Sequence, residues 1–343
     1  MATAVAIDQA DELVFSLWSG YNYYKPLSEG FAAHTGNFPR QRVNVKSGQK
    51  CYCVPVPEHQ KKLPLPHWLY MISHPPASGS FVWPIDLVRF ADESSALVFP
   101  VRADIGSDLP RADLFGRFSD FDERNMRRPA AQFGLGDGWI CAFLSAFLPL
   151  CARLEAQGYA LQNLSAETLF WIDGKLLLDF SCDTLIASID PSIEVPPDCG
   201  DPNYADPFQW GKATRDVISA RFSVASLLFK LLVGTLPYCG VDMRSVPNDP
   251  RIKDQHRDWL NAYYRSAVFI FDETDTSNAL TTMDDDPIYT QHWNALPPDL
   301  QGMFRRVFAG GNAMRRNRRV FSYGAAEWLA AMPLAAMPKE VRG

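Results

Sequence analysis

The segment SARFSVASLLFKLLVG, residues 219–234, places the strongest constraint on how this chain can fold. Its apolar residues surround nearly the whole circumference of the predicted helix. A helix of this kind is stable only where other elements cover it on every side, so we expect it at the centre of a helical core. The chain has 343 residues, of which 47% are hydrophobic, and this is enough for one large or two medium domains.

Further helices are predicted around this one. GWICAFLSAFLPLCARLEAQG (138–158) reads as a long apolar helix that ends at Gly158, and Pro149 is expected to kink it or to remove one internal hydrogen bond. The remaining predicted helices lie at 256–271, at about 298–309 and at about 324–332. The second part of the chain is therefore predicted to be mainly helical.

The first hundred residues carry strand signals instead. RVNVKSGQKCYCVPV (42–56) is a predicted hairpin, because apolar residues alternate with polar ones on both sides of a Ser47-Gly48 turn. SALVFPVRA (95–103) reads as a further strand, and HWLYMISHPP (67–76) reads as a helix that ends at its prolines.

These signals predict an α+β fold with two lobes. The β-rich N-lobe with its one helix is assigned to residues 1–104, the helical C-lobe to 105–337, and a tail to 338–343. The C-lobe is expected to contain one small hairpin.

Composition argues against several classes of protein. The net charge is −6, which gives no electrostatic case for binding nucleic acid or an anionic membrane. No apolar run reaches the roughly 18 residues that a membrane span needs, and the N-terminus does not read as a signal peptide. The seven cysteines are an odd number in a long chain, which favours a reducing cytosol over a disulfide scaffold.

Two local patterns have an ordinary structural interpretation. Cys51 and Cys53 would share one face of a strand, but two ligands without a second pair do not make a zinc site. We interpret them as small strand residues. A group of arginines is interpreted as a solvated helix face followed by a loop; its members are Arg305, Arg306, Arg315, Arg316, Arg318 and Arg319.

The segment YALQNLSAETLFWIDGKLLLDFSCDT, residues 159–184, carries the functional signal. A loop follows the long helix, two short strands come next, and Asp179-Phe180 closes the second strand. This order resembles the catalytic loop and metal-binding strand of protein kinases. Their usual catalytic-loop pattern is G-Y-x-H-x-D-L-x-x-x-N-I-L, and their usual metal-binding motif is Asp-Phe-Gly.

Other parts of the chain carry the same resemblance, and together they cover most of its length. The chain is most similar to bacterial eukaryotic-like kinases found beside PP2C-type phosphatases and von Willebrand A proteins. The matching pieces are LPLPHWLYMISHPP for the N-lobe helix, SALVFPV for the strand that leads into the hinge, CGDPNYADPF for the end of the activation segment, ARFSVASLLFKLLVGTLPYCG for the buried C-lobe helix and GAAEWLAAM for the last helix.

The departures from the kinase pattern predict a loss of catalysis. Pro55 stands where the resemblance places the strand lysine, and Lys50 would lie on the opposite face of the strand. Pro55 is expected to mark an edge strand or a bulge, because proline removes a ladder donor. The positions that match the partner glutamate are Leu65, Pro66 and His67, and none is acidic.

The catalytic loop has changed in the same direction. Asn163 occupies the position of the catalytic aspartate, and an amide cannot take up the proton of a hydroxyl. Thr168 replaces the metal-binding asparagine, and one neutral hydroxyl is a poor substitute. Ala220 stands where the buried helix usually carries an aspartate that fastens this loop.

Asp179 is the one acidic metal ligand that remains. It is either a residual Mg²⁺ or nucleotide contact, or a carboxylate bonded to backbone amides at a turn. ATP with Mg²⁺ is therefore the candidate cofactor, although the departures predict that none is required. No metal site is predicted.

The sequence thus predicts a pseudokinase, a cytoplasmic protein-binding scaffold or regulator in a signalling or stress-response cassette. The resemblance implies an active kinase, a PP2C-type phosphatase or a von Willebrand A protein as partner. The acidic, threonine-rich segment 274–293 is interpreted as a solvated loop or as a docking or phosphoacceptor segment. Two alternatives remain: an atypical nucleotide-dependent transferase with rearranged catalytic residues, and an unrelated α+β protein.

Overall fold

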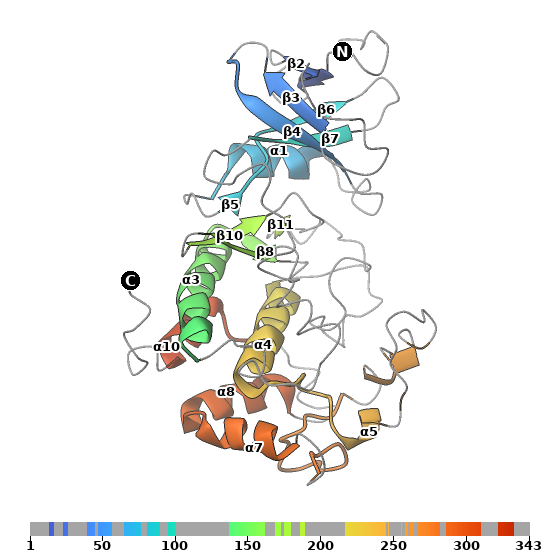
Figure 1. The fold of residues 1–343 in the computed structure, drawn as a ribbon, viewed down its shortest axis with the longest axis vertical. Helices are drawn as coiled ribbons and strands as arrows, with labels where there is room; N and C mark the ends of the chain where they lie inside the picture. The colour runs from blue at the N-terminus through green and yellow to red at the C-terminus, as the bar shows by residue number, and fades with distance from the viewer. Residues whose placement is uncertain are drawn as a thin grey trace.

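The structure, a computed structural model, describes residues 14–16, 23–26, 40–44, 47–56, 65–76, 81–89, 95–100, 137–161, 169–172, 175–179, 186–188, 217–244, 246, 255, 258–259, 261–263, 267–281, 286–309 and 322–332. Strands and one helix from the first hundred residues form one end of the molecule, here called the sheet region (Figure 1). The helices beyond residue 136 form the other end, the helical region. The fold is therefore α+β, as predicted. The predicted bounds at 104 and 337 lie outside the described residues.

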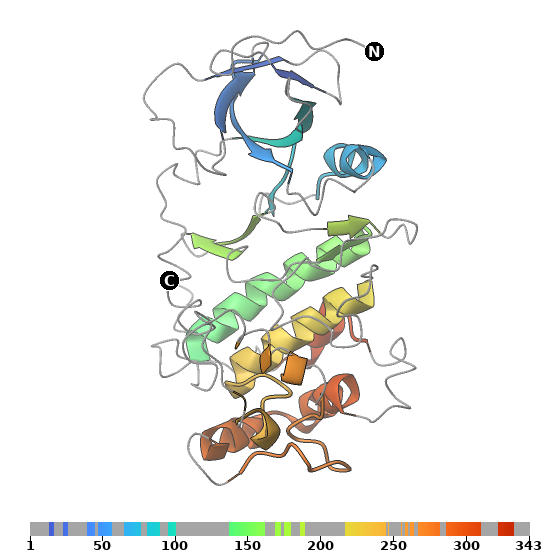
Figure 2. The same ribbon diagram turned by 90° about the vertical axis from the view of Figure 1, so that its right-hand side faces the viewer.

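Six strands of the sheet region close into a barrel. In pairing order they are β1 (Val14–Ser16), β2 (Tyr23–Pro26), β3 (Arg40–Asn44), β4 (Lys50–Pro55), β7 (Ser95–Pro100) and β6 (Asp86–Arg89). Strand β6 pairs with β1 to complete the ring, and every neighbouring pair is antiparallel. Figure 2 shows the barrel as a ring, with helix α1 (Leu65–Ser73) beside it.

The predicted hairpin is confirmed as β3 and β4, which pair Val43 with Lys50. Gly48 in the turn has a φ of 70°, a left-handed conformation that costs little only for glycine. The Ser47 hydroxyl accepts a hydrogen bond from the N–H of Gln49 at 3.2 Å. The turn residues therefore help to set the register of this strand pair.

The helical region contains α3 (Asp137–Ala156), α4 (Val217–Val233), α5 (Val241–Arg244), α7 (Asp286–Ala295), α8 (Pro298–Phe308) and α10 (Ala325–Ala331). Four of the predicted helices are confirmed as α3, α4, α8 and α10. Gly158 and Gly234, which follow α3 and α4, have φ values of 88° and 99°. Helix α4 is buried along most of its length, and α3 continues through Pro149.

The helix predicted at 256–271 is wrong in its second half, because the described residues 267–271 form irregular turns. The buried side chain of Asn278 explains the difference. Its amide nitrogen donates to the carbonyl oxygens of Tyr238 and Val268, each at 2.9 Å. The segment is thereby held against the loop that follows α4, and this contact between distant residues overrides local helix propensity.

The interpretation of 274–293 as a solvated loop is also wrong in part. Residues 273–277 are exposed, but residues from 286 onward belong to α7. Tyr289 and Trp293 on that helix are buried, and α7 packs against α4. The acidic composition of the first half concealed an amphipathic helix in the second.

Two small sheets lie outside the barrel, and one of them connects the regions. Strand β10 (Lys175–Asp179) pairs antiparallel with β9 (Leu169–Ile172), which confirms the small predicted hairpin. Strand β10 also pairs in parallel with β5 (Phe81–Val82) of the sheet region. Strand β8 (Tyr159–Leu161) pairs antiparallel with β11 (Ile186–Ser188). Backbone hydrogen bonds therefore join segments that lie far apart in the sequence.

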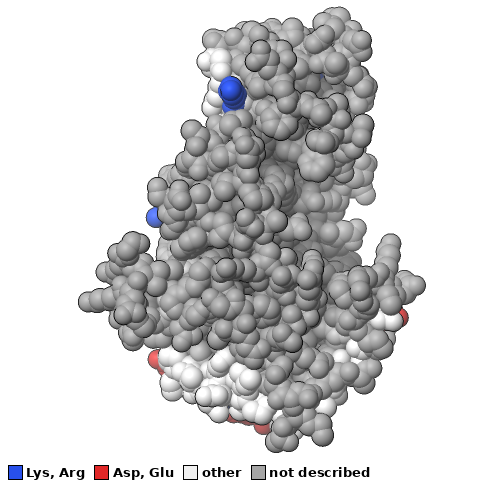
Figure 3. Space-filling view, viewed as in Figure 1, with Lys and Arg blue, Asp and Glu red and all other residues white. Residues whose placement is uncertain are grey.

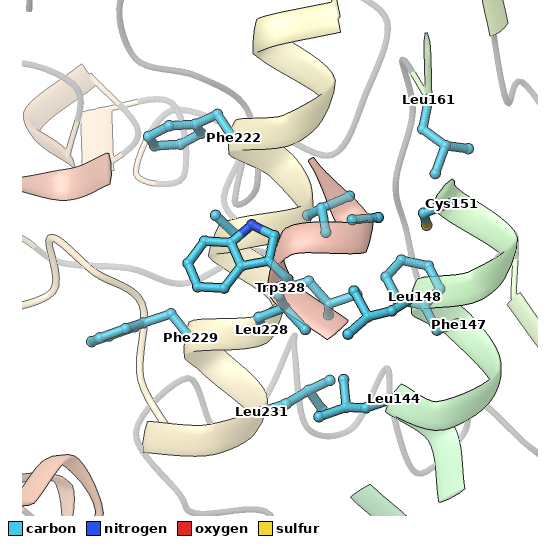
Figure 4. Close-up of a cluster of buried hydrophobic side chains, with 14 of the residues drawn as sticks. Leu144, Phe147, Leu148, Cys151, Leu161, Phe222, Leu228, Phe229, Leu231 and Trp328 are labelled. Carbon is cyan, nitrogen blue, oxygen red and sulfur yellow. The ribbon is translucent and has the colours of Figure 1, made fainter. Parts of the chain in front are cut away.

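The main core is one continuous apolar cluster that runs from α1 and one side of the sheet into the helical region. Figure 4 shows its centre, where Trp328 of α10 projects between α3 and α4. In this view Leu144 of α3 lies opposite Leu231 of α4, and Phe229 projects from the other side of α4. The burial of α4 predicted from its all-round apolar surface is thus achieved by several neighbouring elements.

Candidate functional site

The sheet and helical regions meet at a cluster of aromatic side chains. Trp83, between β5 and β6, is buried, and its indole N–H donates to the carbonyl oxygen of Met71 in the last turn of α1 at 2.7 Å. The Trp83 ring meets the ring of Tyr159 edge-on, with centroids 5.1 Å apart. The Tyr159 hydroxyl, which follows α3 in the chain, donates to the carbonyl oxygen of His74 at 2.7 Å. The C-terminal end of α1 is therefore held from both regions.

Two polar side chains of this junction, those of Tyr159 and His74, lie beside the end of α1. Burial, and then the neighbouring Tyr70, raise the pKa of the Tyr159 hydroxyl, which stays a hydrogen-bond donor. The imidazole of His74 stacks on the Tyr70 ring with centroids 4.2 Å apart. Its Nδ1 lies 3.0 Å from the carbonyl oxygen of Tyr70 and 2.9 Å from the hydroxyl oxygen of Ser73. The side chain of His74 therefore lies against the last turn of α1.

Pro55, the residue predicted to replace the catalytic lysine, is the last residue of β4 and pairs with Ala96 of β7. The expectation of an edge strand or bulge is wrong, because β4 pairs with β3 on one side and β7 on the other in continuous register. Pairing with β3 ends at Cys53, so the proline lies beyond the last position at which that neighbour needs a donor. A central strand can therefore end in proline without loss of a ladder hydrogen bond.

Strand β4 and helix α1 themselves contain few charged residues. Lys50 is the one lysine of β4, and it lies exposed at the start of that strand. Helix α1 has the sequence LPHWLYMIS and contains no acidic residue. Leu65, Pro66 and His67 form its first turn, and their side chains lie outside the described residues. These two elements cannot supply the lysine–glutamate pair of a kinase.

The two catalytic-loop positions, Asn163 and Thr168, lie outside the described residues. Their neighbours in the chain are described: β8 ends at Leu161 and β9 begins at Leu169. Leu161 pairs with Ile186 of β11. The loop that carries both positions thus leaves one small sheet and enters the other.

Asp179 is the last residue of β10, and its backbone pairs with Val82 of β5. Trp83 follows Val82 directly, so Asp179 lies on the strand beside the junction cluster. The Asp179 side chain lies outside the described residues. Among the described side chains, no three His, Cys, Asp or Glu residues gather as a metal site.

Cys51 and Cys53 lie in the barrel interior with Val88, Ala96 and Val98. Each is 1% exposed, which confirms that they share one face of β4 as small strand residues.

Helix α4 contains a buried cation that sequence analysis did not identify. Lys230 is fully buried, and burial lowers the pKa of its ammonium group to about 7. Ala220, near the start of the same helix, is also buried, and the next residue, Arg221, forms an ion pair with Glu155 of α3 at 3.3 Å. Helix α4 therefore makes a charged contact with α3 through the residue that follows Ala220, the position at which the resemblance would place an aspartate.

Sequence reasoning missed most of the junction cluster. The aromatic residues Trp83 and Tyr159 are separated by more than seventy positions, and no local pattern relates them. One available signal was the segment SFVWP, which is rich in apolar and aromatic residues. A buried tryptophan in such a segment needs a hydrogen-bond partner for its indole N–H.

Acidic side chains are exposed on the helical region. On the face in Figure 3, the visible acidic side chains lie toward the helical end of the molecule. Glu273, Asp275 and Asp299 are exposed residues of that region. Within the described part of the chain, no helix has the length and apolarity required to cross a bilayer.

The sequence matches no protein-family model and no curated protein. The kinase resemblance therefore depends on the residues and contacts given above.

Proposed function

We propose that the chain is a degenerate, two-lobed relative of the protein-kinase fold that works as a protein-binding scaffold or regulator. The arrangement of strands supports this. A kinase N-lobe is a five-stranded antiparallel sheet with one helix; β2, β3, β4, β7 and β6 with α1 resemble that composition, and β1 adds a sixth strand that closes the sheet into a barrel. The elements α3, β8, β9 and β10 follow in the order of the kinase helix, catalytic loop and metal-binding strand.

The composition of β4 and α1 carries the proposal of inactivity. Phosphoryl transfer depends on positioned charge, above all on a strand lysine held by a helix glutamate. Strand β4 ends in Pro55, its lysine is exposed at the opposite end, and α1 has no carboxylate. The loss of such a group typically lowers the rate by orders of magnitude.

The catalytic loop adds a second deficit. A carboxylate at the position of Asn163 would accept the proton of the attacking hydroxyl, whereas an amide has no basic site for it. Where nucleotide and Mg²⁺ did bind, Asp179 would be the remaining acidic contact, and Mg²⁺ would neutralise phosphate charge. Neither Asn163 nor Thr168 could replace the missing base.

The junction cluster favours a fixed platform over a hinged enzyme. Trp83 and Tyr159 fill the space between the regions, and each donates a hydrogen bond to the last turn of α1 or the residue that follows it. A surface whose elements are already ordered binds a partner at a lower entropic cost. The partner that the resemblance implies is an active kinase, a PP2C-type phosphatase or a von Willebrand A protein in the same cytoplasmic signalling or stress-response cassette.

The first test is a thermal melt of the purified chain with ATP or ADP, each with and without Mg²⁺ or Mn²⁺. A ligand at 100 times its dissociation constant stabilises a protein by about 2.7 kcal/mol, which corresponds to a shift of several degrees. We expect no shift at millimolar nucleotide. The variants Asp179→Ala and Asp299→Ala provide a matched pair, because Asp299 is an exposed acid on α8, far from β10.

A metal-dependent shift that Asp179→Ala abolishes and Asp299→Ala retains would contradict the inactive scaffold and favour the atypical transferase. If no nucleotide binds, calorimetric titration with each of the three purified partner classes tests the scaffold role. Saturable binding to one class, unchanged by Asp179→Ala, supports the proposal. Failure to bind all three contradicts the proposed partners.

A further inference from the structure

The half-buried Ser322 contacts Arg221 where three elements of the helical region meet, and one N–H group of this arginine has no hydrogen-bond acceptor. Arg221 of α4 directs Nη1 at the hydroxyl of Ser322, 3.2 Å away, and at the carbonyl oxygen of Ser322, 3.5 Å away. Its Nη2 pairs with a carboxylate oxygen of Glu155 on α3 at 3.3 Å. Ser322 lies just before α10, so the arginine joins α3, α4 and the segment that leads into α10.

The guanidinium has hydrogen-bonding capacity to spare. Both acceptors of Nη1 are neutral, and the contacts are long compared with the 2.7–2.9 Å typical of a charge-assisted bond. The Nε of Arg221 is buried and has no acceptor in the described structure. A dianionic group on the Ser322 oxygen would supply short, charged acceptors at the position that Nη1 already faces.

The sequence before Ser322 matches this geometry. It reads RRNRRVFS, which places Arg319 and Arg318 three and four positions before the serine. Cationic side chains at such positions are what an acidic substrate groove on a protein kinase would recognise, because opposite charges steer and orient the segment. The two arginines themselves lie outside the described residues, and they enter the argument only by their place in the sequence.

We propose that Ser322 is a phosphorylation site for an arginine-directed serine kinase and that Arg221 receives the phosphate. The Ser322 Oγ attacks the γ-phosphorus of a nucleoside triphosphate bound to that kinase, the bond from phosphorus to the β-phosphate oxygen breaks, and the nucleoside diphosphate leaves. The hydroxyl proton passes to the base of that kinase. This site needs no catalysis by the present chain and does not rest on the proposed scaffold role.

The phosphate would change how the three elements are held. At neutral pH it carries a charge near −2, so Arg221 would bind it more strongly than it binds the neutral hydroxyl. Glu155 would then lie close to a second anion, and Gly324 leaves that carboxylate little room, because a Cβ on this glycine would lie 2.7 Å from Oε2 of Glu155. Phosphorylation therefore strengthens the contact of α4 with the α10 segment and weakens its contact with α3.

The experiment treats the purified full chain with an arginine-directed serine kinase, ATP and Mg²⁺, and maps the product by mass spectrometry. We expect one phosphate on Ser322, none in Ser322→Ala and a loss of at least tenfold in rate in Arg319→Gln. A peptide of residues 314–326 serves as the accessible reference. Phosphorylation of the peptide but not of the folded chain would overturn the proposal.

The role of Arg221 is tested by melting the modified and unmodified proteins. Phosphate is expected to raise the melting temperature of the native sequence by about 1–3 °C, and to raise that of Glu155→Gln further, because the competing carboxylate is gone. Arg221→Gln should abolish the rise, and Arg221→Lys should keep part of it. An equal rise in Arg221→Gln would show that this arginine does not receive the phosphate.

Discussion

The interiors of the sheet region and the helical region are filled in opposite ways. Among the described side chains of the barrel strands, one buried cluster consists of small residues, namely Cys51, Cys53, Val88, Ala96 and Val98. The helical region is filled by aromatic rings around Phe229, whose ring centroid lies 5.3 Å from that of Phe304 and 5.5 Å from that of Phe269.

The geometry of the two architectures explains the contrast. A barrel of six strands has a narrow interior, because its diameter grows with the number of strands. Packed helices stand about 8–10 Å apart, and the space around a central helix accepts large rings in edge-on and stacked arrangements. We therefore expect the helical region to hold most of the free energy of unfolding and to be less tolerant of substitution.

Substitution of one glycine in each region should give the largest contrast. A Cβ at Gly240 would overlap the carbonyl oxygen of Asn278, and backbone there cannot give way. A Cβ at Gly48 would meet nothing within 4 Å, so only its φ of 70° opposes alanine. We expect Gly240→Ala to cost about 5 kcal/mol or more, and Gly48→Ala to cost about 1–2 kcal/mol.

Urea unfolding of the two glycine variants measures this difference. Gly302→Ala is a control inside helix α8, where a Cβ also meets nothing within 4 Å and alanine should be neutral or slightly stabilising. Similar losses for Gly240→Ala and Gly48→Ala would break the comparison.

The buried lysine should give the helical region a pH dependence of its own. Lys230 has a pKa of about 7 in the folded state against 10.5 for the unperturbed group. The unfolded chain therefore binds more protons between these two pH values. The free-energy penalty for burying the charged ammonium group is full below pH 7 and is lost as the pH rises toward 10.5. Near neutral pH the penalty is roughly 4 kcal/mol, and about 2 kcal/mol of it should disappear by pH 9.

The variant Lys230→Met tests that linkage. It should be more stable than the native sequence at pH 7. Its free energy of unfolding should not show the increase between pH 7 and 9 that is expected for the native sequence. Lys50→Met, which changes an exposed lysine of the sheet region, is the matched control and should keep the rise. A pH profile in Lys230→Met identical to that of the native sequence would assign the titration to another group.

Truncation of one side chain in each interior tests the packing contrast directly. Phe229→Ala removes a fully buried ring from a cluster of aromatic neighbours and should cost about 3–5 kcal/mol. Val88→Ala removes two methyl groups from the barrel and should cost about 1–2 kcal/mol. Calorimetry of both variants gives the comparison, and a larger loss for Val88→Ala would reverse it.

The smallest effect is expected where the two regions join. Tyr159→Phe removes the hydrogen bond to the carbonyl oxygen of His74 and should cost about 1 kcal/mol. Tyr70→Phe is the control, because the Tyr70 side chain is 41% exposed, and it should change stability by less than about 0.5 kcal/mol. A single calorimetric transition that splits into two in Tyr159→Phe would show that this bond couples the regions.

Elements with strong local signals could be predicted from the sequence. The turn at Gly48, the glycine stop at Gly158 and the all-round apolar surface of α4 each depend on a few adjacent residues. The central place of β4 in the barrel, and the position of Pro55 at the end of that strand, required its neighbours to be known.

Features set by distant contacts could not be predicted. The irregular course of 267–271 depends on Asn278 and on two carbonyl oxygens outside any local window. The junction of Trp83 with Tyr159, and the burial of Lys230 on an apolar helix, likewise appear only when separate elements are packed together. The contacts of the junction therefore could not be derived from local patterns in the sequence.

Closure of the barrel limits how another chain can be recognised. Strand β1 pairs with β2 on one side and with β6 on the other, so each of the six described strands already has two neighbours. A peptide ligand cannot extend this sheet by strand addition, because strand addition needs a sheet edge with unpaired backbone N–H and C=O groups. Recognition at this end of the molecule must be read from side chains, and specificity there can change through point substitutions while the backbone stays as it is.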